Sequence, residues 1–226
     1  MEEFLMKKIA TIRTDFPTKF GIPRQSGVVT ELTGKIVFEP LYRDAAALRG
    51  IEGFSHLWLI WQFSENVQEG WSPTVRPPIL GGNKRVGVFA TRSPFRPNPI
   101  GLSCVKLEQI ADSDAGRVLI VSGVDLMDGT PILDIKPYLP YVDSHPEATE
   151  GFRSGGWNRG LEVDFPSELL ARVPEYQRRA LMGVLENDPR PSYHHDPGRV
   201  YGFGFGKMEV KFVVNDKVLK VTDVII

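Results

Sequence analysis

The chain has 226 residues, 42% of them hydrophobic and 24% charged, with a formal net charge of −1 and one cysteine, Cys104. This composition is typical of a globular protein of one large domain, or one domain with a small appendage, and excludes a disordered or fibrous chain. A single cysteine also excludes an intrachain disulfide and a cysteine-rich zinc or iron–sulfur site.

The start of the chain and its apolar runs bear on location. The first residues begin with acids at Glu2 and Glu3 and have no long apolar core, so the sequence predicts no signal peptide. No run is apolar over the roughly eighteen residues that a membrane helix needs. We therefore expect a cytoplasmic protein.

Short β-rich runs bounded by Gly, Pro or polar residues dominate residues 1–140. Their Val, Ile, Leu and aromatic content predicts strands at residues 9–13, 27–30, 34–38, 56–63, 85–90, 104–110 and 118–124, with a short helix at 43–48. Strands and helices do not alternate regularly. The sequence therefore predicts a mainly β fold, a compact β-barrel or sandwich, and not a doubly wound Rossmann sheet.

The remainder of the chain has a different pattern. Residues 140–158 are rich in Ser, His, Pro, Gly and Asp and have no period, which indicates a linker. A helix is predicted at residues 166–185, with Ser167 as N-cap and a break at Pro174. Strands are predicted at 200–205, 208–214 and 218–226. We expect a barrel domain (1–141), a linker (142–158) and a small α+β C-terminal domain (159–226) that leans on the barrel for stability.

The charges are unevenly distributed. Residues 70–107 contain no Asp or Glu, and their cations are Arg76, Lys84, Arg85, Arg92, Arg96 and Lys106. This stretch is either a solvated face compensated by acids elsewhere in the fold or an anion-binding surface for phosphate.

Within that stretch, residues 92–101 combine three prolines with Arg92, Arg96 and Asn98. Proline fixes φ, so this segment forms neither a helix nor an inner strand, and its ordering costs little entropy. A stiff loop that holds two guanidinium groups suits an anion or a carboxylate. The alternative is a rigid surface connection.

Other motifs predict no chemistry. The run GFGFGK at residues 202–207 lacks the Ser or Thr of a phosphate-binding loop and the βαβ unit of a dinucleotide site, so it reads as a strand with a glycine face. The four histidines lack metal-ligand spacing, and we expect no metal. No nucleophile-elbow motif supports a Ser-His-Asp hydrolase.

The ordered blocks of the chain carry a family resemblance. They are FGIPRQSG at residues 20–27, IEGFSHLWL at 51–59, VRPP at 75–78, LGGN at 80–83, ATRSPFRPNPIG at 90–101, DLMDGTPILDIKPY at 125–138 and DPRPSY at 188–193. Each block alone is weak, but in this order they resemble the TsaA/TrmO family, in particular its bacterial, two-part members. The resemblance covers nearly the whole chain.

The resemblance implies a β-barrel methyltransferase outside the Rossmann class, working as a homodimer with S-adenosylmethionine close to the subunit interface. It further implies methyl transfer to the N6 nitrogen of threonylcarbamoyladenosine at position 37, beside the tRNA anticodon. The residues that match the family's cofactor-binding motifs are Pro23, Arg24, Gln25, His56, Leu57, Arg92, Leu102, Asp128, Gly129, Thr130 and Pro131. Two of these have simpler interpretations: His56 as a core histidine, and residues 128–131 as a hairpin turn.

The acceptor nitrogen lies between a purine and a carbonyl, so an oxygen base would help remove its proton. Asp125, Asp128 and Tyr138 are the candidates for this base. The candidates for tRNA binding are Arg76, Arg85, Arg96, Asp188, Arg190 and Tyr193. Trp71 either stacks on a base or is buried. Two other functions stay open: a non-catalytic RNA-binding barrel, and the same scaffold methylating a different acceptor.

Overall fold

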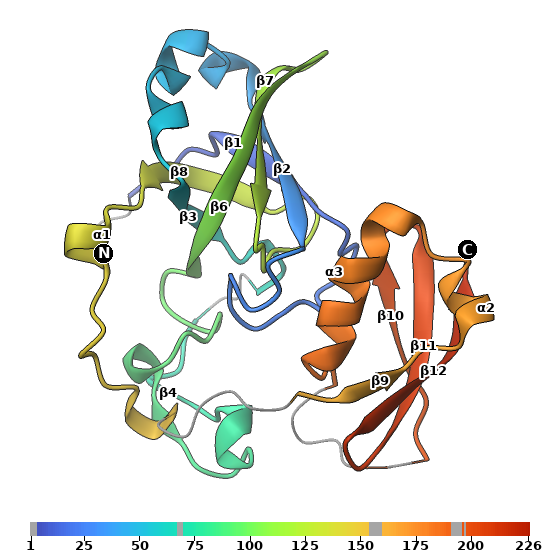
Figure 1. Cartoon of the computed structure of the whole chain (residues 1–226). Coiled ribbons are helices and arrows are strands. Elements are labelled where there is room, and N and C mark those ends of the chain that lie inside the picture. The colour runs from blue at the N-terminus through green and yellow to red at the C-terminus, as the bar shows by residue number, and fades with distance from the viewer. Residues whose placement is uncertain (1–3, 67–69, 154–159, 191–195, 197) are drawn as a thin grey trace.

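A computed structural model describes the protein over residues 4–66, 70–153, 160–190, 196 and 198–226 (Figure 1). Six strands form a closed barrel in the order β1 (Ala10–Arg13), β2 (Thr33–Phe38), β7 (Gly116–Ser122), β6 (Ile100–Ser113), β3 (His56–Gln62) and β8 (Pro131–Pro137). Every neighbouring pair is antiparallel. The predicted mainly β, non-Rossmann barrel is confirmed.

The barrel interior is filled by alternate residues of its strands. Because successive side chains of a strand point to opposite faces, every second residue faces inward. Most of the inward residues are aliphatic and almost fully buried: Ala10, Ile12, Ile36, Leu57, Leu59, Val105, Leu119, Val121 and Ile132. The interior is therefore a packed core, and any site must lie at its ends or on its loops.

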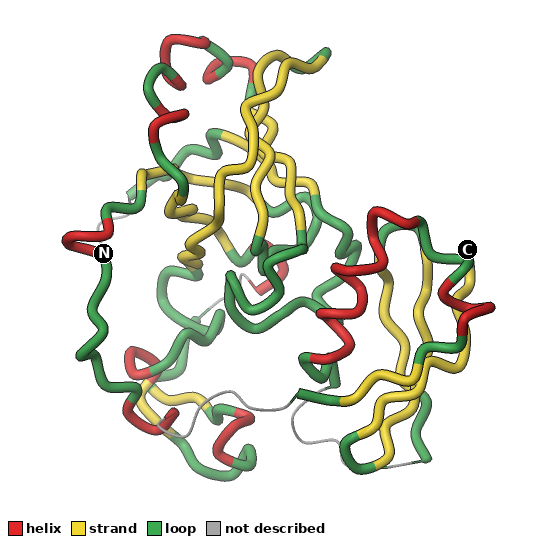
Figure 2. The backbone as a smooth tube through the Cα atoms, in the orientation of Figure 1, coloured by secondary structure: helices red, strands yellow, loops and turns green. Residues whose placement is uncertain are grey.

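The two long connections that precede and follow β3 have little regular structure (Figure 2). Between β2 and β3 lie the 3-10 helices η1 (Pro40–Tyr42), η2 (Ala45–Leu48) and η3 (Ile51–Gly53). Between β3 and β6 lie η4 (Ser64–Asn66), the strand pair β4 (Thr74–Val75) and β5 (Val86–Gly87), η5 (Pro78–Leu80) and η6 (Val88–Ala90). We call residues 64–99 the insertion. It contains most of the acid-free stretch, namely residues 70–99.

The C-terminal part is a four-stranded sheet in the order β10 (Tyr201–Phe205), β11 (Met208–Asn215), β12 (Val218–Ile225) and β9 (Glu162–Asp164), with β9 parallel to β12. Two helices accompany it, α2 (Ser167–Leu170) and α3 (Glu175–Glu186). The buried residues of α3 recur at helical spacing: Gln177, Ala180, Leu181, Val184 and Leu185.

The barrel and the C-terminal sheet share one hydrophobic core. Phe16 meets Phe205 edge-on at 5.5 Å between ring centroids, and the Gly206 N–H donates to the Asp15 carbonyl at 2.7 Å. A Cβ on Gly21 would lie 2.5 Å from the Phe203 ring, so only glycine lets this loop approach β10. The C-terminal part therefore packs against the barrel through a shared core, as expected. The division at residues 141 and 158 stays a proposal.

Several expected elements are wrong in detail. Residues 27–30 form turns and not a strand, because Gly27 has a φ of +76°. Residues 85–90 hold only β5 and η6, and the helix at 43–48 is the shorter 3-10 helix η2. Pro166, not Ser167, is the N-cap of α2, whereas the break at Pro174 is confirmed.

The segment expected as a linker also contains helix. It includes α1 (Pro140–Asp143) and the 3-10 helix η7 (Gly151–Arg153), and its residues 154–159 lie outside the described part of the chain. Strand β8 was not predicted, because a proline at each end and Asp134 in its middle weaken the strand pattern.

Of the helices in the described ranges, none combines the length and the apolar character needed to cross a membrane.

Candidate active site

Asp125 lies in the loop that follows β7, where the structure buries a carboxylate at one end of the barrel. Ser103 Oγ donates to Asp125 Oδ1 at 2.6 Å, and the backbone of Ser26 also hydrogen-bonds to this carboxylate. Burial raises the pKa of Asp125 to about 6, although these hydrogen bonds and the nearby charge of Arg92 lower it. A carboxylate with this pKa is ionised at neutral pH and can take up a proton there.

The orientation of Ser103 depends on Trp61. The Trp61 indole Nε1 donates to Ser103 Oγ at 3.0 Å, and Ser103 is fully buried on β6. Because the indole can only donate, the hydroxyl accepts from Trp61 and its own proton points to Asp125. Trp61, Ser103 and Asp125 therefore form a directed hydrogen-bond chain from the barrel interior to the loop.

Gly101 makes room for this chain. It pairs with Trp61 across β6 and β3, and a Cβ there would lie 2.2 Å from the indole ring. The indole fits only over a residue with no side chain.

We expect Gly101→Ala to lower the free energy of unfolding by about 1–3 kcal/mol, because the methyl group overpacks the barrel against Trp61. The displaced indole would also release Ser103, so catalysis should fall together with stability. Urea unfolding and a methyl-transfer assay measure the two effects. Gly53→Ala is the matched control, since no atom lies within 4 Å of its added Cβ. Equal stability of the two variants would contradict the predicted packing.

Arg92 lies close enough to Asp125 for its charge to act on that carboxylate, and it contacts the loop after β1. Its Nη1 donates to Gln25 Oε1, and Gln25 Nε2 donates to the Arg24 carbonyl. Arg24 in turn donates to the Arg190 carbonyl at 3.5 Å. Arg24 and Gln25, predicted from one block of the sequence, and Arg92, predicted from another, are therefore brought together in one network.

The C-terminal end of that network is a buried ion pair. Arg190 contacts both carboxylate oxygens of Asp188, at 2.7 and 2.9 Å, and the two side chains are 11% and 5% exposed. Asp188 has a φ of +51°, which the pairing helps to hold. A mostly apolar pocket separates this turn from the loop after β1, with Pro23, Arg24 and Gln25 on one side and Asn187 to Arg190 on the other.

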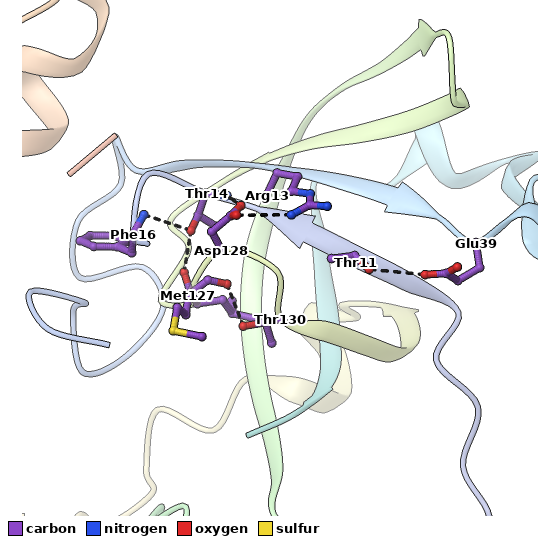
Figure 3. Close-up of polar contacts among 9 residues, drawn as sticks. Thr11, Arg13, Thr14, Phe16, Glu39, Met127, Asp128 and Thr130 are labelled. Carbon is purple, nitrogen blue, oxygen red and sulfur yellow. Dashed lines mark hydrogen bonds and ion pairs between the residues drawn. The ribbon is translucent and has the colours of Figure 1, made fainter. Parts of the chain in front are cut away.

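Residues 128–131 form a turn that packs on β1 (Figure 3). Asp128 accepts from the Thr14 N–H at 3.0 Å and pairs with Arg13 at 3.3 Å, and Thr130 Oγ1 donates to the Met127 carbonyl. Gly129 has a φ of +82°, as this turn requires. These contacts confirm a turn at Asp128, Gly129, Thr130 and Pro131, but the hairpin interpretation is wrong, because the flanking strands β7 and β8 are not neighbours in the barrel and β8 pairs with β1 and β3. Their role toward a cofactor stays a prediction.

His56, Leu57, Leu102 and Tyr138 lie around β3. The Leu57 side chain is fully buried in the barrel core, whereas Leu102 points outward and is 53% exposed. His56 Nδ1 lies 2.9 Å from Ser55 Oγ, and the His56 ring meets Tyr138 edge-on. The contacts of Tyr138 are with His56 and Trp58, and those of Asp128 are with β1, so the three candidate bases stand in different surroundings.

The predicted tRNA-binding arginines of the insertion differ in how they are held. Arg85 donates to Thr74 Oγ1 at 2.7 Å, and Arg96 donates to the Thr91 carbonyl at 3.0 Å. Arg76 is exposed. Tyr193 lies outside the described residues.

Sequence reasoning missed Trp61, Ser103 and Ser26. Ser26 Oγ accepts from the Cys104 N–H at 3.1 Å and fixes its loop beside β6. The sequence contained only part of the signal, a tryptophan at an inward position of β3 and the small residues Gly101 and Ser103 at inward positions of β6, because it does not specify how the two strands pair.

No three His, Cys, Asp or Glu side chains converge as metal ligands would in the ranges described.

Comparison with known families gives two matches. The tRNA-methyltransferase O N-terminal domain matches residues 11–144, and the TrmO C-terminal domain matches residues 158–225. Together they span nearly the whole chain.

Similar proteins agree with these matches. The tRNA (adenine(37)-N6)-methyltransferase of Escherichia coli (strain K12) is 39% identical, with 96% of this chain and 95% of the relative covered. The enzyme of the same name from Eikenella corrodens is 48% identical, with 70% and 90% covered. A crystal structure of TrmO from Pseudomonas aeruginosa superposes with a TM-score of 0.81 at 33% identity, with 99% and 97% covered.

Proposed function

The chain belongs to the tRNA-methyltransferase O family, and on this premise we propose that it transfers a methyl group from S-adenosylmethionine to the N6 nitrogen of threonylcarbamoyladenosine at position 37 of tRNA. The observation that carries the proposal is a buried carboxylate, Asp125, with a pKa of about 6 beside the Arg92–Gln25 contact. Methylation of the acceptor nitrogen needs a base, and the carboxylate of the cofactor needs a guanidinium group to bind it. Both are present at one end of the barrel.

The residues present fit the cofactor by their chemistry. Its amino-acid carboxylate requires a charged donor, and Arg92 offers a guanidinium already oriented by Gln25. Its adenine requires an apolar slot with polar edges, which the pocket beside Pro23 and Arg24 supplies. When bound, S-adenosylmethionine supplies an electrophilic methyl group on a sulfonium.

Asp125 is the proposed base. The acceptor nitrogen carries a proton that is lost as the nitrogen takes the methyl group, and Asp125 accepts that proton. Ser103 holds one carboxylate oxygen in place, so the base does not have to reorganise during the reaction. Holding donor and acceptor about 3 Å apart and in line provides much of the remaining rate.

The C-terminal turn is proposed to meet the anticodon loop. Asp188 and Arg190 neutralise each other, so the turn contacts RNA by shape and backbone more than by net charge. Through the Arg190 carbonyl it also touches Arg24. A tRNA seated on this turn would therefore rest against the loop proposed to hold the cofactor.

A homodimer and a cytoplasmic location are also part of the proposal. Ile100 and Leu102 are exposed side by side on the outward face of β6, 36% and 53% respectively, which supports contact with a second copy through this face. Sedimentation of the wild type and of Leu102→Glu tests the dimer, since a charge there should shift the equilibrium to monomer.

The reaction is tested with S-adenosylmethionine carrying a labelled methyl group and two tRNA preparations, with and without the threonylcarbamoyl group. We expect transfer only to the modified tRNA. Transfer to neither, with RNA binding intact, would favour a non-catalytic RNA-binding protein. Equal transfer to both would mean a different acceptor.

A further inference from the structure

Two aromatic rings are exposed together on the insertion. Trp71 is 55% and Phe89 is 73% exposed, and their ring centroids lie 6.2 Å apart at an interplanar angle of 32°. Exposed aromatic pairs of this size are unusual on a surface that serves only solubility. The pair is therefore a candidate binding surface.

The backbone holds both rings rigidly. Val88 is buried and its N–H donates to the Pro73 carbonyl at 3.0 Å, which ties η6, the 3-10 helix that carries Phe89, to the segment before β4 that carries Trp71. At the C-terminal end of η6, Thr91 Oγ1 donates a hydrogen bond to the Val88 carbonyl at 2.8 Å. With Val88 turned inward, Phe89 is directed to solvent. Such a preorganised surface loses little entropy when it binds.

One arginine is held next to the segment that carries Trp71, two further cations are exposed on the same hairpin, and residues 70–107 contain no acid. Arg85 donates to Ser72 Oγ and to Thr74 Oγ1, which fixes its guanidinium beside the residue that follows Trp71. Arg76 and Lys84 are exposed on the same hairpin. A symmetric contact with a second copy would bring a second acid-free surface against this one. Single-stranded RNA brings phosphates for the cations and bases for the rings.

We propose that Trp71 and Phe89 form a stacking platform for an unpaired base of the tRNA anticodon loop. The proposal rests on the proposed function and adds where the loop binds. Phe89 precedes Arg92 by three residues, so their Cα atoms lie within about 11 Å of each other. A base stacked on Phe89 therefore lies next to the proposed cofactor site, and the neighbouring nucleotide can reach it.

Binding of an anticodon stem–loop RNA to single variants tests the platform. Alanine replacement of a stacking ring weakens binding about five- to 150-fold, so we expect this range for Trp71→Ala and for Phe89→Ala. Phe89→Tyr keeps a ring and should bind normally, whereas Phe89→Leu should not. Tyr176→Ala, which removes an equally exposed ring at the start of α3, is the control.

Salt dependence separates stacking from charge. The ring variants should leave the slope of log affinity against log salt unchanged, whereas Arg76→Ala should reduce it by about 0.7. Affinity for S-adenosylmethionine and the sedimentation coefficient should stay at wild-type values in Trp71→Ala and Phe89→Ala.

Two results would overturn the platform. One is unchanged RNA affinity in both alanine variants, and the other is a change of oligomeric state in either of them, which would assign the rings to a contact between copies. Failure of the proposed function looks different: the wild type would transfer no methyl group, while RNA binding would still depend on the rings.

Discussion

Asp125→Asn should reduce the rate of methyl transfer by about 10²- to 10⁴-fold, the usual contribution of a positioned base. Asparagine keeps the shape of the side chain and can still accept from Ser103, so cofactor binding and folding should survive. Single-turnover kinetics with modified tRNA measure the effect. Asp112→Asn, which removes an exposed carboxylate at the far end of β6, should be neutral.

The pH profile of the wild type provides an independent check. The ionised form of Asp125 is the active one, so the rate should fall as pH drops through about 6, the raised pKa of this carboxyl. In Asp125→Asn this fall of the rate at low pH, the acid limb of the profile, should be absent. An unaltered limb, or a variant with wild-type rate, would remove Asp125 from the mechanism.

Burial of this carboxylate also predicts a stability effect with a definite sign. The pKa of Asp125 is about 6 in the folded protein against an ordinary value of 3.8, so the folded state binds its proton more tightly. The free energy of unfolding of the wild type should therefore fall relative to that of Asp125→Asn as pH rises from about 4 to 6. The change amounts to at most about 3 kcal/mol. Urea unfolding of both proteins across this range measures it, and parallel curves would contradict it.

Arg92→Ala should weaken binding of S-adenosylmethionine by about 10- to 150-fold, because a charged hydrogen bond to the cofactor carboxylate is lost. Calorimetry measures the affinity. The charge of Arg92 also lowers the pKa of Asp125, so the acid limb of the rate should move to higher pH in the variant. This second readout tests the proximity of the two groups independently of binding.

Arg92→Lys and Arg49→Ala complete the Arg92 series. Lysine keeps the positive charge but lacks the two-pronged guanidinium group. In Arg92→Lys the rate should therefore fall at the same pH as in the wild type, while only part of the affinity for S-adenosylmethionine is recovered. Arg49 directly follows η2, and Arg49→Ala should change neither the affinity for S-adenosylmethionine nor the pH at which the rate falls. Unchanged cofactor affinity in Arg92→Ala would assign Arg92 to RNA or to the structure of its loop.

The barrel could be predicted from the sequence because its strands alternate apolar and polar residues with clear boundaries. Strand β8 could not, since Pro131, Asp134 and Pro137 contradict strand propensity and only its pairing with β1 and β3 stabilises it. The strand expected at residues 27–30 failed for the opposite reason. Its apolar residues suit a strand, but Val29 is buried in the shared core from within a turn, where it lies against Gly183 of α3.

The candidate site divides in the same way. Gln25 and Arg92 came from separate sequence blocks, and the structure brings them into contact. Trp61 and Ser103 could not be identified, because they meet only through the register of β3 against β6, and a single sequence does not specify that register. Asp125 and Asp128 are equally acidic in sequence. Only burial and partners distinguish the carboxylate beside Ser103 from the one that caps β1.

The mass of anticodon-loop fragments of tRNA from a strain that lacks this gene tests the central claim most directly. The account predicts that threonylcarbamoyladenosine loses its extra methyl group there, that the wild-type gene restores it, and that the gene for Asp125→Asn does not. Retention of the methyl group in the deleted strain would contradict the assignment to tRNA.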